Sequence, residues 1–213
     1  MPEELEPTPV KIYYDPLSVA RRTSQKVYLV NEHDKDALLS HMINTQESTR
    51  VIIITKTKRD ADRLSTYLQA GEIKALAIHG NKSATECETT MESFNKDETN
   101  VLIMTDMILQ SQTLTSINQI ISYNIPSEVT HYYARLAVLE EKGEGIALVS
   151  EEEHHLMDAI ESAMKVEILQ EEPEGFSPTS KPEVQQRSKK DKTKKPRHKK
   201  SKTKKESKKK EEE

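Results

Sequence analysis

The strongest constraint on the fold is a regular alternation of short apolar runs, rich in Val and Ile, with segments of helical period. The runs span residues 10–14, 26–30, 51–55, 74–78, 101–104, 119–123 and 145–149. Several are apolar on both faces, which is typical of buried parallel strands. Strands that alternate with helices form right-handed βαβ units. We therefore expect an α/β fold with a parallel sheet and helices on both faces.

Two kinds of signal predict the helices. Residues 34–44 and 58–68 repeat apolar side chains every three or four positions, as amphipathic helices do. Capping-box spacing, a Ser followed three residues later by a Glu, predicts two further helix starts. The two pairs are Ser83 with Glu86 and Ser150 with Glu153.

The charges are divided unevenly along the chain. Residues 1–175 hold 16 Lys and Arg against 30 Asp and Glu, a net charge of −14. Residues 176–213 hold 16 against 6, a net charge of +10. From Pro178 onward Val184 is the one aliphatic residue, so this part cannot bury enough surface to offset the entropy of ordering. The sequence thus predicts an acidic body with a disordered basic tail.

These features predict three parts: a lead-in over residues 1–24, an α/β domain over 25–170 and a Lys-rich disordered tail over 171–213. The apolar runs are too short to cross a bilayer, and the first ten residues are acidic and Pro-rich, unlike a signal peptide. We therefore expect a cytoplasmic protein with no membrane partner. With one Cys and no Cys/His cluster, we also expect no disulfide, no metal and no resident cofactor.

Four segments, in this order and spacing, carry a resemblance to a known family. They are VIIITKTKRDADRLSTYLQ at 51–69, ALAIHGNKS at 75–83, VLIMTDM at 101–107 and IISYNIP at 120–126. They resemble the second RecA-like lobe of DEAD-box RNA helicases and, among its branches, the RhlE-like one. The resemblance covers about residues 10–170. It implies a RecA-like sheet and RNA as the partner, including ribosomal or structured RNA.

The resemblance implies RNA contacts after the strand at 51–55. In the family this segment touches RNA phosphates, which points to Thr55, Lys56 and Lys58, with Arg59 beside them. The alternative is a solvated helix start whose positive charges are interleaved with Asp60 and Asp62.

Two further positions are candidates for phosphate contacts. Gly80, Asn81 and Lys82 form a loop before a helix, where backbone N–H groups favour an anion. The alternative is an ordinary turn with Gly80 at positive φ. Thr105 ends a strand; its family equivalent donates to a phosphate, and the alternative is a residue that simply caps the strand.

The sequence departs from the family where the chemistry takes place. An Ala-Arg-Gly-Leu-Asp stretch of the family is replaced by Gln110, Ser111, Gln112 and Thr113. The signature His-Arg-Ile-Gly-Arg-Thr-Gly-Arg becomes ARLAVLEEKG over residues 134–143, in which Arg135 alone remains of its arginines. The family's later arginines contact the triphosphate, whereas Glu140 and Glu141 lie here and would oppose its charge. Without the Arg-rich stretch it would orient, Asp106 is expected to be structural.

The tail is a second candidate for RNA binding. Between Lys189 and Lys210 only Asp191 and Glu206 interrupt a strongly basic run, which favours binding to a polyanion. The tail residues predicted to bind RNA are Lys189, Lys190, Lys194, Lys195, Arg197, Lys199 and Lys200. The alternative is a solubility role, or pairing with the acidic body.

Three functions follow from these observations. The chain is an RNA-binding protein derived from a helicase lobe, one lobe of a split RNA helicase that acts in trans with a separate first lobe, or a protein-interaction scaffold. ATP would be a cofactor only in the second case.

We predict that the purified chain does not hydrolyse ATP, with or without RNA. Its five glycines form no G-x-x-x-x-G-K-[ST] loop, and no Asp-Glu-Ala-Asp segment is present for Mg²⁺. Phosphate release is the measurement. ATP-dependent unwinding by the chain alone would contradict the prediction, and hydrolysis that appears only on adding a first lobe would support action in trans.

Overall fold

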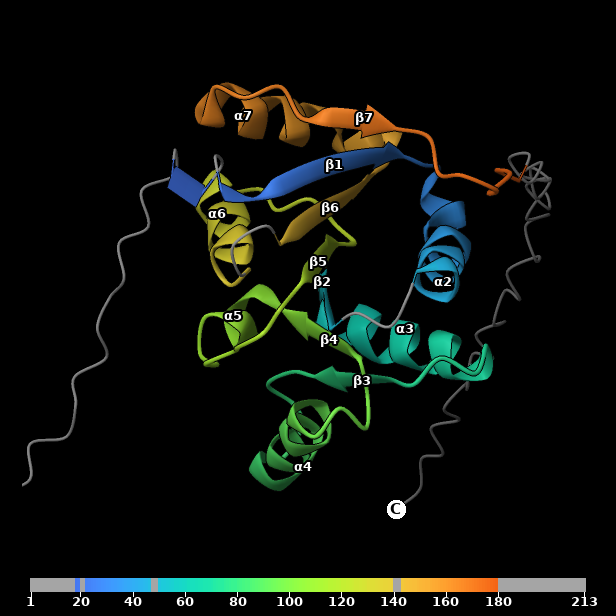
Figure 1. Cartoon of the computed structure of the whole chain (residues 1–213), viewed down its shortest axis with the longest axis vertical. Helices are drawn as coiled ribbons and strands as arrows, with labels where there is room; N and C mark the ends of the chain where they lie inside the picture. Colours follow the sequence, from blue (N-terminus) through green and yellow to red (C-terminus); the bar gives the residue numbers. More distant parts are fainter. Residues whose placement is uncertain (1–17, 20–21, 47–49, 140–142, 180–213) are drawn as a thin grey trace, which may run out of the picture. The chain divides into compact units, whose positions relative to one another are not determined.

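The computed structural model describes residues 18–19, 22–46, 50–139 and 143–179 (Figure 1). Within these ranges, seven strands form one parallel sheet in the order β3-β4-β2-β5-β6-β1-β7. The strand expected at 10–14 and the predicted disorder beyond residue 179 lie outside the described residues.

Six of the seven described strands agree with the strands predicted from sequence. They are β1 (Ser24–Leu29), β2 (Val51–Thr55), β3 (Ala75–Ile78), β4 (Val101–Thr105), β5 (Gln119–Ser122) and β6 (Glu144–Val149). The seventh, β7 (Leu169–Glu171), was not predicted, because a short edge strand with one apolar residue leaves no hydrophobic pattern. It crosses the expected domain boundary at residue 170.

The predicted helices are present, together with two that were not predicted. The helices are α2 (Lys35–Thr45), α3 (Lys58–Ala70), α4 (Ala84–Asn95), α5 (Asp106–Leu109), α6 (Val129–Ala137) and α7 (His154–Met164), with 3₁₀ turns η1 (Glu32–Asp34) and η2 (Glu151–Glu153). The four residues of α5 are too few for a periodic signal. The last residues of α6 overlap the segment 134–143, in which the family signature is altered.

The side chains of both predicted capping boxes make hydrogen bonds. At the start of α4, the Ser83 hydroxyl accepts from the Glu86 N–H at 3.2 Å, and the Glu86 carboxylate accepts from the Ser83 N–H at 2.8 Å. At residue 150, the Glu153 carboxylate accepts from the Ser150 N–H at 3.3 Å. This second box begins η2, which leads directly into α7.

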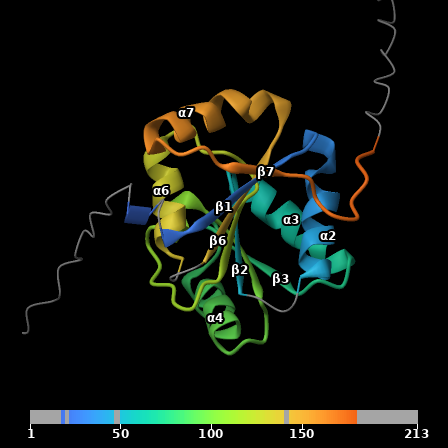
Figure 2. The ribbon, with the colours of Figure 1, turned by 45° about the horizontal axis from the view of Figure 1, so that its top comes forward.

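Helices cover both faces of the sheet, as expected. Alternate residues of a strand face opposite sides, so Val51 and Ile53 of β2 join one apolar cluster, and Ile52 and Ile54 join another. The first cluster includes the buried residues of α2 and α3, and the second those of α6 and α7. Figure 2 shows these two pairs of helices on opposite sides of the strands. The fold is therefore the expected RecA-like α/β sandwich.

None of the helices in the described part of the chain is long and apolar enough to cross a membrane. The longest, α3, has 13 residues and exposes a polar face.

Gly145 in β6 lies against Leu136 of α6. A Cβ atom at this position would overlap Cδ2 of Leu136, which is buried. We expect Gly145→Ala to lower the free energy of unfolding by about 1–3 kcal/mol through overpacking, as measured by urea denaturation. In a Leu136→Ala background the same change should cost little. An equal cost in both backgrounds would show that the overlap is not the cause.

Candidate nucleic-acid interface

The parallel sheet brings the sequence-predicted residues of the domain to one edge. The strands β3, β4 and β2 are neighbours, and Thr55 lies opposite Thr105 in the register of β2 with β4. The loop that begins at His79 follows β3 at the same edge. Ligands of open α/β sheets bind at this carboxyl edge of the strands. We call the surface formed by residues 55–59, 79–82 and 105–107 the carboxyl rim.

The first part of the rim leads from β2 into α3. The Thr55 hydroxyl donates to the Thr57 carbonyl at 3.2 Å, and the Thr57 hydroxyl caps α3 by accepting from the Asp60 N–H at 3.1 Å. The backbone N–H of Lys56 donates to Oδ1 of Asn124 at 3.1 Å, which links the ends of β2 and β5. The Lys56 side chain is exposed, whereas the half-buried Lys58 points its ammonium at the next loop.

The loop after β3 is held by its own hydrogen bonds and by α3. Nζ of Lys58 donates to Oδ1 of Asn81 at 2.8 Å, and the Lys82 N–H donates to the His79 carbonyl at 2.9 Å. The imidazole of His79 is buried, with Nε2 2.8 Å from a carboxylate oxygen of Asp62. The same oxygen lies 3.8 Å from Nζ of Lys82. Asp62 thus offsets part of the positive charge of this loop.

One alternative for this loop is corrected, because Gly80 does not adopt a positive φ. The N–H groups of Asn81 and Lys82 both donate to His79. At the helix start that follows, the Glu86 carboxylate accepts from Ser83, and anion binding by this loop stays a prediction. These hydrogen bonds hold the pKa of Glu86 below its ordinary value, so the carboxylate stays ionised.

Thr105 presents a buried hydroxyl without a partner. Its Oγ1 makes no hydrogen bond within the described residues, although the residue is only 7% exposed. Thr105 is the last residue of β4, and its hydroxyl makes no capping hydrogen bond to α5. A buried donor without a partner costs free energy that a ligand oxygen can recover.

Asp106 has the structural role expected for it, and its partner is the one arginine left from the family signature. The Arg135 guanidinium donates to both carboxylate oxygens of Asp106, at 2.7 and 2.8 Å, and to the Asn124 carbonyl at 2.8 Å. The Arg135 side chain is 1% exposed, and its contacts hold α6 against the ends of β4 and β5. Sequence reasoning missed the pair, because the two residues lie 29 positions apart.

A second buried cation, Lys35 of α2, was also missed. Its ammonium donates to the Tyr123 carbonyl at 3.1 Å and contacts the carboxylates of Glu153 and, at 2.9 Å, Glu32. Burial alone would raise the pKa of Glu153, but the hydrogen bond and positive charge of Lys35, together with the N–H groups of Ser150 and Ile125, hold that pKa below its ordinary value. The cluster ties α2 to the ends of β5 and β6. The sequence showed Lys35 only as the polar start of a helix.

One hollow of about 450 Å³ lies away from the rim, at the opposite, amino edge of the sheet, where Val51 and Val101 begin their strands. No group of three or more His, Cys, Asp and Glu side chains within the described ranges is placed to hold a metal ion. The basic tail residues predicted to bind RNA all lie beyond residue 179, outside the described part.

Comparisons with known proteins find related sequences. Residues 34–137 match the helicase conserved C-terminal domain. The chain is 26% identical over 146 residues to the DEAD-box ATP-dependent RNA helicase RhpA of Helicobacter pylori, covering 67% of this chain and 30% of that protein. This part of the chain is thus similar to the C-terminal domain of DEAD-box RNA helicases. The chain spans only about 30% of this relative's length.

Solved structures agree on the fold. A DEAD box protein from the hyperthermophile Methanococcus jannaschii matches with a TM-score of 0.68 and 26% identity, over 72% of this chain and 43% of that one. Dbp5 of S. cerevisiae bound to RNA and ADP BeF3 matches with a TM-score of 0.66 and 19% identity, over 71% and 42%.

The pair formed by Asp106 and Arg135 gives a stability prediction. Asp106→Ala leaves the buried guanidinium without its carboxylate and should lower the free energy of unfolding by about 3–5 kcal/mol in urea denaturation. Removing both charges with Asp106→Ala and Arg135→Met should recover much of the loss. As a control, Glu92→Ala removes an exposed partner of Lys96 and should cost below about 0.5 kcal/mol. Equal costs for Asp106→Ala and the control would contradict the structural role.

Proposed function

We propose that this chain is an RNA-binding protein derived from the C-terminal lobe of a DEAD-box RNA helicase, and that it holds single-stranded RNA at the carboxyl rim. The observation that carries the proposal is the meeting, at one sheet edge, of exposed basic side chains with the partnerless hydroxyl of Thr105. Phosphate oxygens accept from both kinds of donor.

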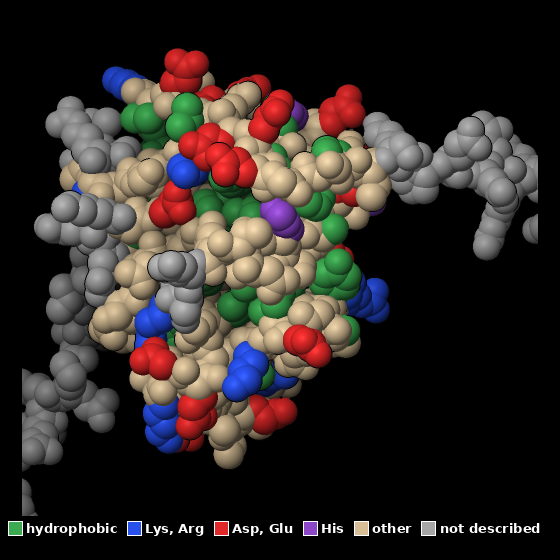
Figure 3. All heavy atoms as spheres, turned by 45° about the vertical axis from the view of Figure 1, so that its right-hand side comes forward, with side chains coloured by type: hydrophobic (Ala, Val, Ile, Leu, Met, Phe, Trp, Pro, Cys, Tyr) green, Lys and Arg blue, Asp and Glu red, His purple; other side chains and the backbone are tan. Residues whose placement is uncertain are grey.

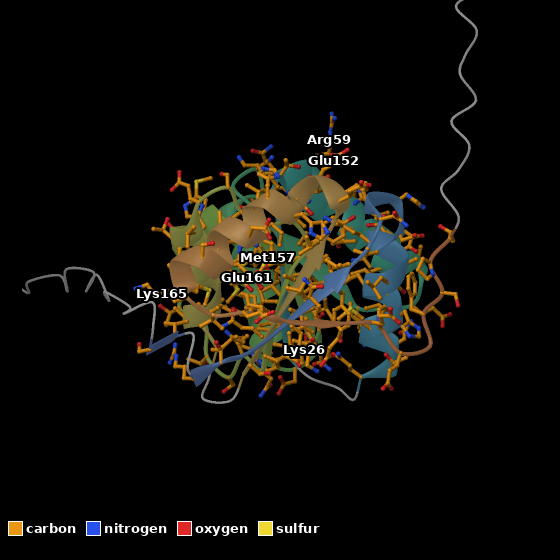
Figure 4. All side chains as sticks on the ribbon, turned by 90° about the horizontal axis from the view of Figure 1, so that it is seen from above. Lys26, Arg59, Glu152, Met157, Glu161 and Lys165 are labelled. Atoms are coloured by element: carbon orange, nitrogen blue, oxygen red, sulfur yellow. The ribbon has the colours of Figure 1, made fainter. Side chains whose placement is uncertain are left out.

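Two basic side chains of the rim are free for such contacts. Lys56 and Arg59 are exposed and form no ion pair within the described residues, and Figure 4 shows Arg59 extending away from the domain. Lys58 and Lys82 are partly engaged by Asn81 and Asp62. A phosphate near the rim would therefore meet two free cations first.

The rest of the domain does not add a continuous basic surface. Residues 1–175 carry a net charge of −14, and Figure 3 shows acidic and basic side chains interleaved over the face it presents. Long-range electrostatics thus oppose RNA, and local contacts must hold it. We propose that the basic residues beyond residue 179 supply most of the affinity by releasing counterions, while the rim sets where the strand lies.

Further parts of the proposal rest on the family. The RhlE-like branch is supported by the motif order. The loss of the later arginines is supported by residues 134–143, whose one arginine, Arg135, is buried against Asp106. Neither autonomous ATPase nor unwinding activity is therefore part of the proposal.

The Dbp5 structure that shares the fold was solved with RNA. We propose the cytoplasm as the location.

One observation favours the second candidate, a lobe that acts in trans. Met107, directly after Asp106 on the rim, is 63% exposed, which is high for a large apolar side chain. An apolar residue beside the proposed RNA contacts would suit a second protein domain that closes over this edge.

We predict that the rim and the tail contribute separately to RNA binding. The assay is fluorescence anisotropy with a short single-stranded RNA at several salt concentrations. Ending the chain at Thr179 removes all 16 Lys and Arg of residues 176–213, so the affinity should fall steeply and the salt dependence should flatten by about 0.7 in log–log slope per lost phosphate contact.

Single substitutions test the rim. In the shortened chain, Lys56→Ala should weaken the remaining binding roughly threefold. The matched control is Lys74→Ala, which removes an equal charge at the amino edge of the sheet, and it should have little effect. Equal effects of the two substitutions would contradict a site at the rim. An unchanged affinity after removal of the tail would favour the scaffold function instead.

A further inference from the structure

The segment after β7 does not leave the domain where the strand ends. Because β7 pairs in parallel with β1, its end points toward the carboxyl edge of the sheet. Residues 172–179, which composition had assigned to the disordered tail, continue past the start of α2, as the orange trace in Figure 1 shows. We call residues 172–179 the strap.

Contacts with α2 hold the middle of the strap. The Glu174 carbonyl lies 2.8 Å from Nε2 of His41, and the Phe176 ring packs on the same imidazole with the ring centroids 5.8 Å apart. Gly175 has φ +72°, and a Cβ atom there would lie 3.6 Å from Cε1 of His41. Glycine therefore lets the chain turn against the helix and bring Phe176 onto the apolar cluster.

A single acidic side chain fixes the end of the strap. Oδ1 of Asp34, a residue only 1% exposed, accepts from the Thr179 N–H at 3.3 Å and from the Thr179 hydroxyl. Its other oxygen lies 3.3 Å from Nδ2 of Asn31 and 3.4 Å from Nε2 of His33. No Lys or Arg of the described ranges pairs with Asp34. This contact between Asp34 and Thr179 is the latch of the strap.

The latch depends on the protons that Thr179 donates. Burial alone would raise the pKa of Asp34, but hydrogen bonds from Thr179 and Asn31 outweigh it and hold that pKa below its ordinary value. The carboxylate is therefore ionised while the latch is closed. A change that removed the hydroxyl proton, or added negative charge at Thr179, would turn the attraction into repulsion.

We propose that Thr179 is a phosphorylation site and that a phosphate there opens the latch and releases the strap. The hydroxyl oxygen would form a bond to the terminal phosphorus of a nucleoside triphosphate held by a protein kinase. The bond from that phosphorus to its bridging oxygen would break, the nucleoside diphosphate would leave, and the hydroxyl proton would pass to a base of the kinase. The ester oxygen can no longer donate to Asp34, and a charge of about −2 then faces the carboxylate.

The structure makes Thr179 accessible to such an enzyme. Ser177, Pro178 and Thr179 are all exposed, and the end of the strap is held by two hydrogen bonds rather than by buried apolar contacts. Segments with few buried contacts open locally at low free-energy cost. Release frees eight residues, which span roughly 26 Å when extended. The chain beyond residue 179 would gain that reach whether or not it binds RNA.

The test compares three full-length chains by amide hydrogen exchange: unmodified, with phosphothreonine incorporated at residue 179, and with phosphoserine incorporated at residue 177 as a control of similar charge. We expect exchange at residues 174–179 to rise about tenfold with the phosphate on Thr179 and to change little with the phosphate on Ser177. Exchange in β2 and β4 should be equal in all three. Equal strap exchange in the two phosphorylated chains would overturn the latch.

Two further measurements separate charge repulsion from simple loss of a hydrogen bond. Thr179→Val removes the hydroxyl without adding charge, so exchange should rise less than with the phosphate. Asp34→Asn should restore part of the protection in the phosphorylated chain, because the amide can donate to phosphate; no restoration would overturn the repulsion. Mass spectrometry of the protein purified from its own cells tests the modification, and the absence of phosphate from Thr179 under all growth conditions tested would overturn it.

Discussion

Parallel strand pairing is the constraint on which the rest of this structure depends. Because β3, β4, β2, β5, β6 and β1 all run in one direction, they end at the same edge, and β2, β4 and β5 place the polar end residues Thr55, Thr105 and Ser122 there. Thr55 and Thr105 are neighbours only because β2 and β4 pair in register. Apolar residues fill both faces of the strands, so this edge is where polar groups can gather without cost to the core.

Buried charges make that edge rigid. Arg135 joins α6 to the ends of β4 and β5 through Asp106 and Asn124, and Lys35 joins α2 to the ends of β5 and β6. Because the charges must be desolvated, such pairs add little net stability to the fold. Removing one partner is nevertheless strongly destabilising, so the pairs favour this packing of the helices over others. An arginine used in this way is unavailable for catalysis.

In the proposed function, the acidic body and the basic residues beyond it act oppositely on RNA. The net charge of −14 over residues 1–175 would repel RNA, and the charge of +10 over residues 176–213 would attract it. The strap spans the boundary between these two parts of the sequence and packs on α2. Release of the strap would lengthen the segment that joins the domain to the basic residues.

The sequence by itself determined the α/β class, six of the described strands, the amphipathic helices and both capping boxes, because these depend on periodicity and on residues three or four positions apart. It also identified Asp106 as structural. Only the tertiary structure decided what holds Asp106, where Lys35 lies and how far the domain continues past residue 170, since each depends on residues distant in sequence. Local sequence patterns do not predict such contacts. The contacts form when the strands pair and the ends of separate strands come together.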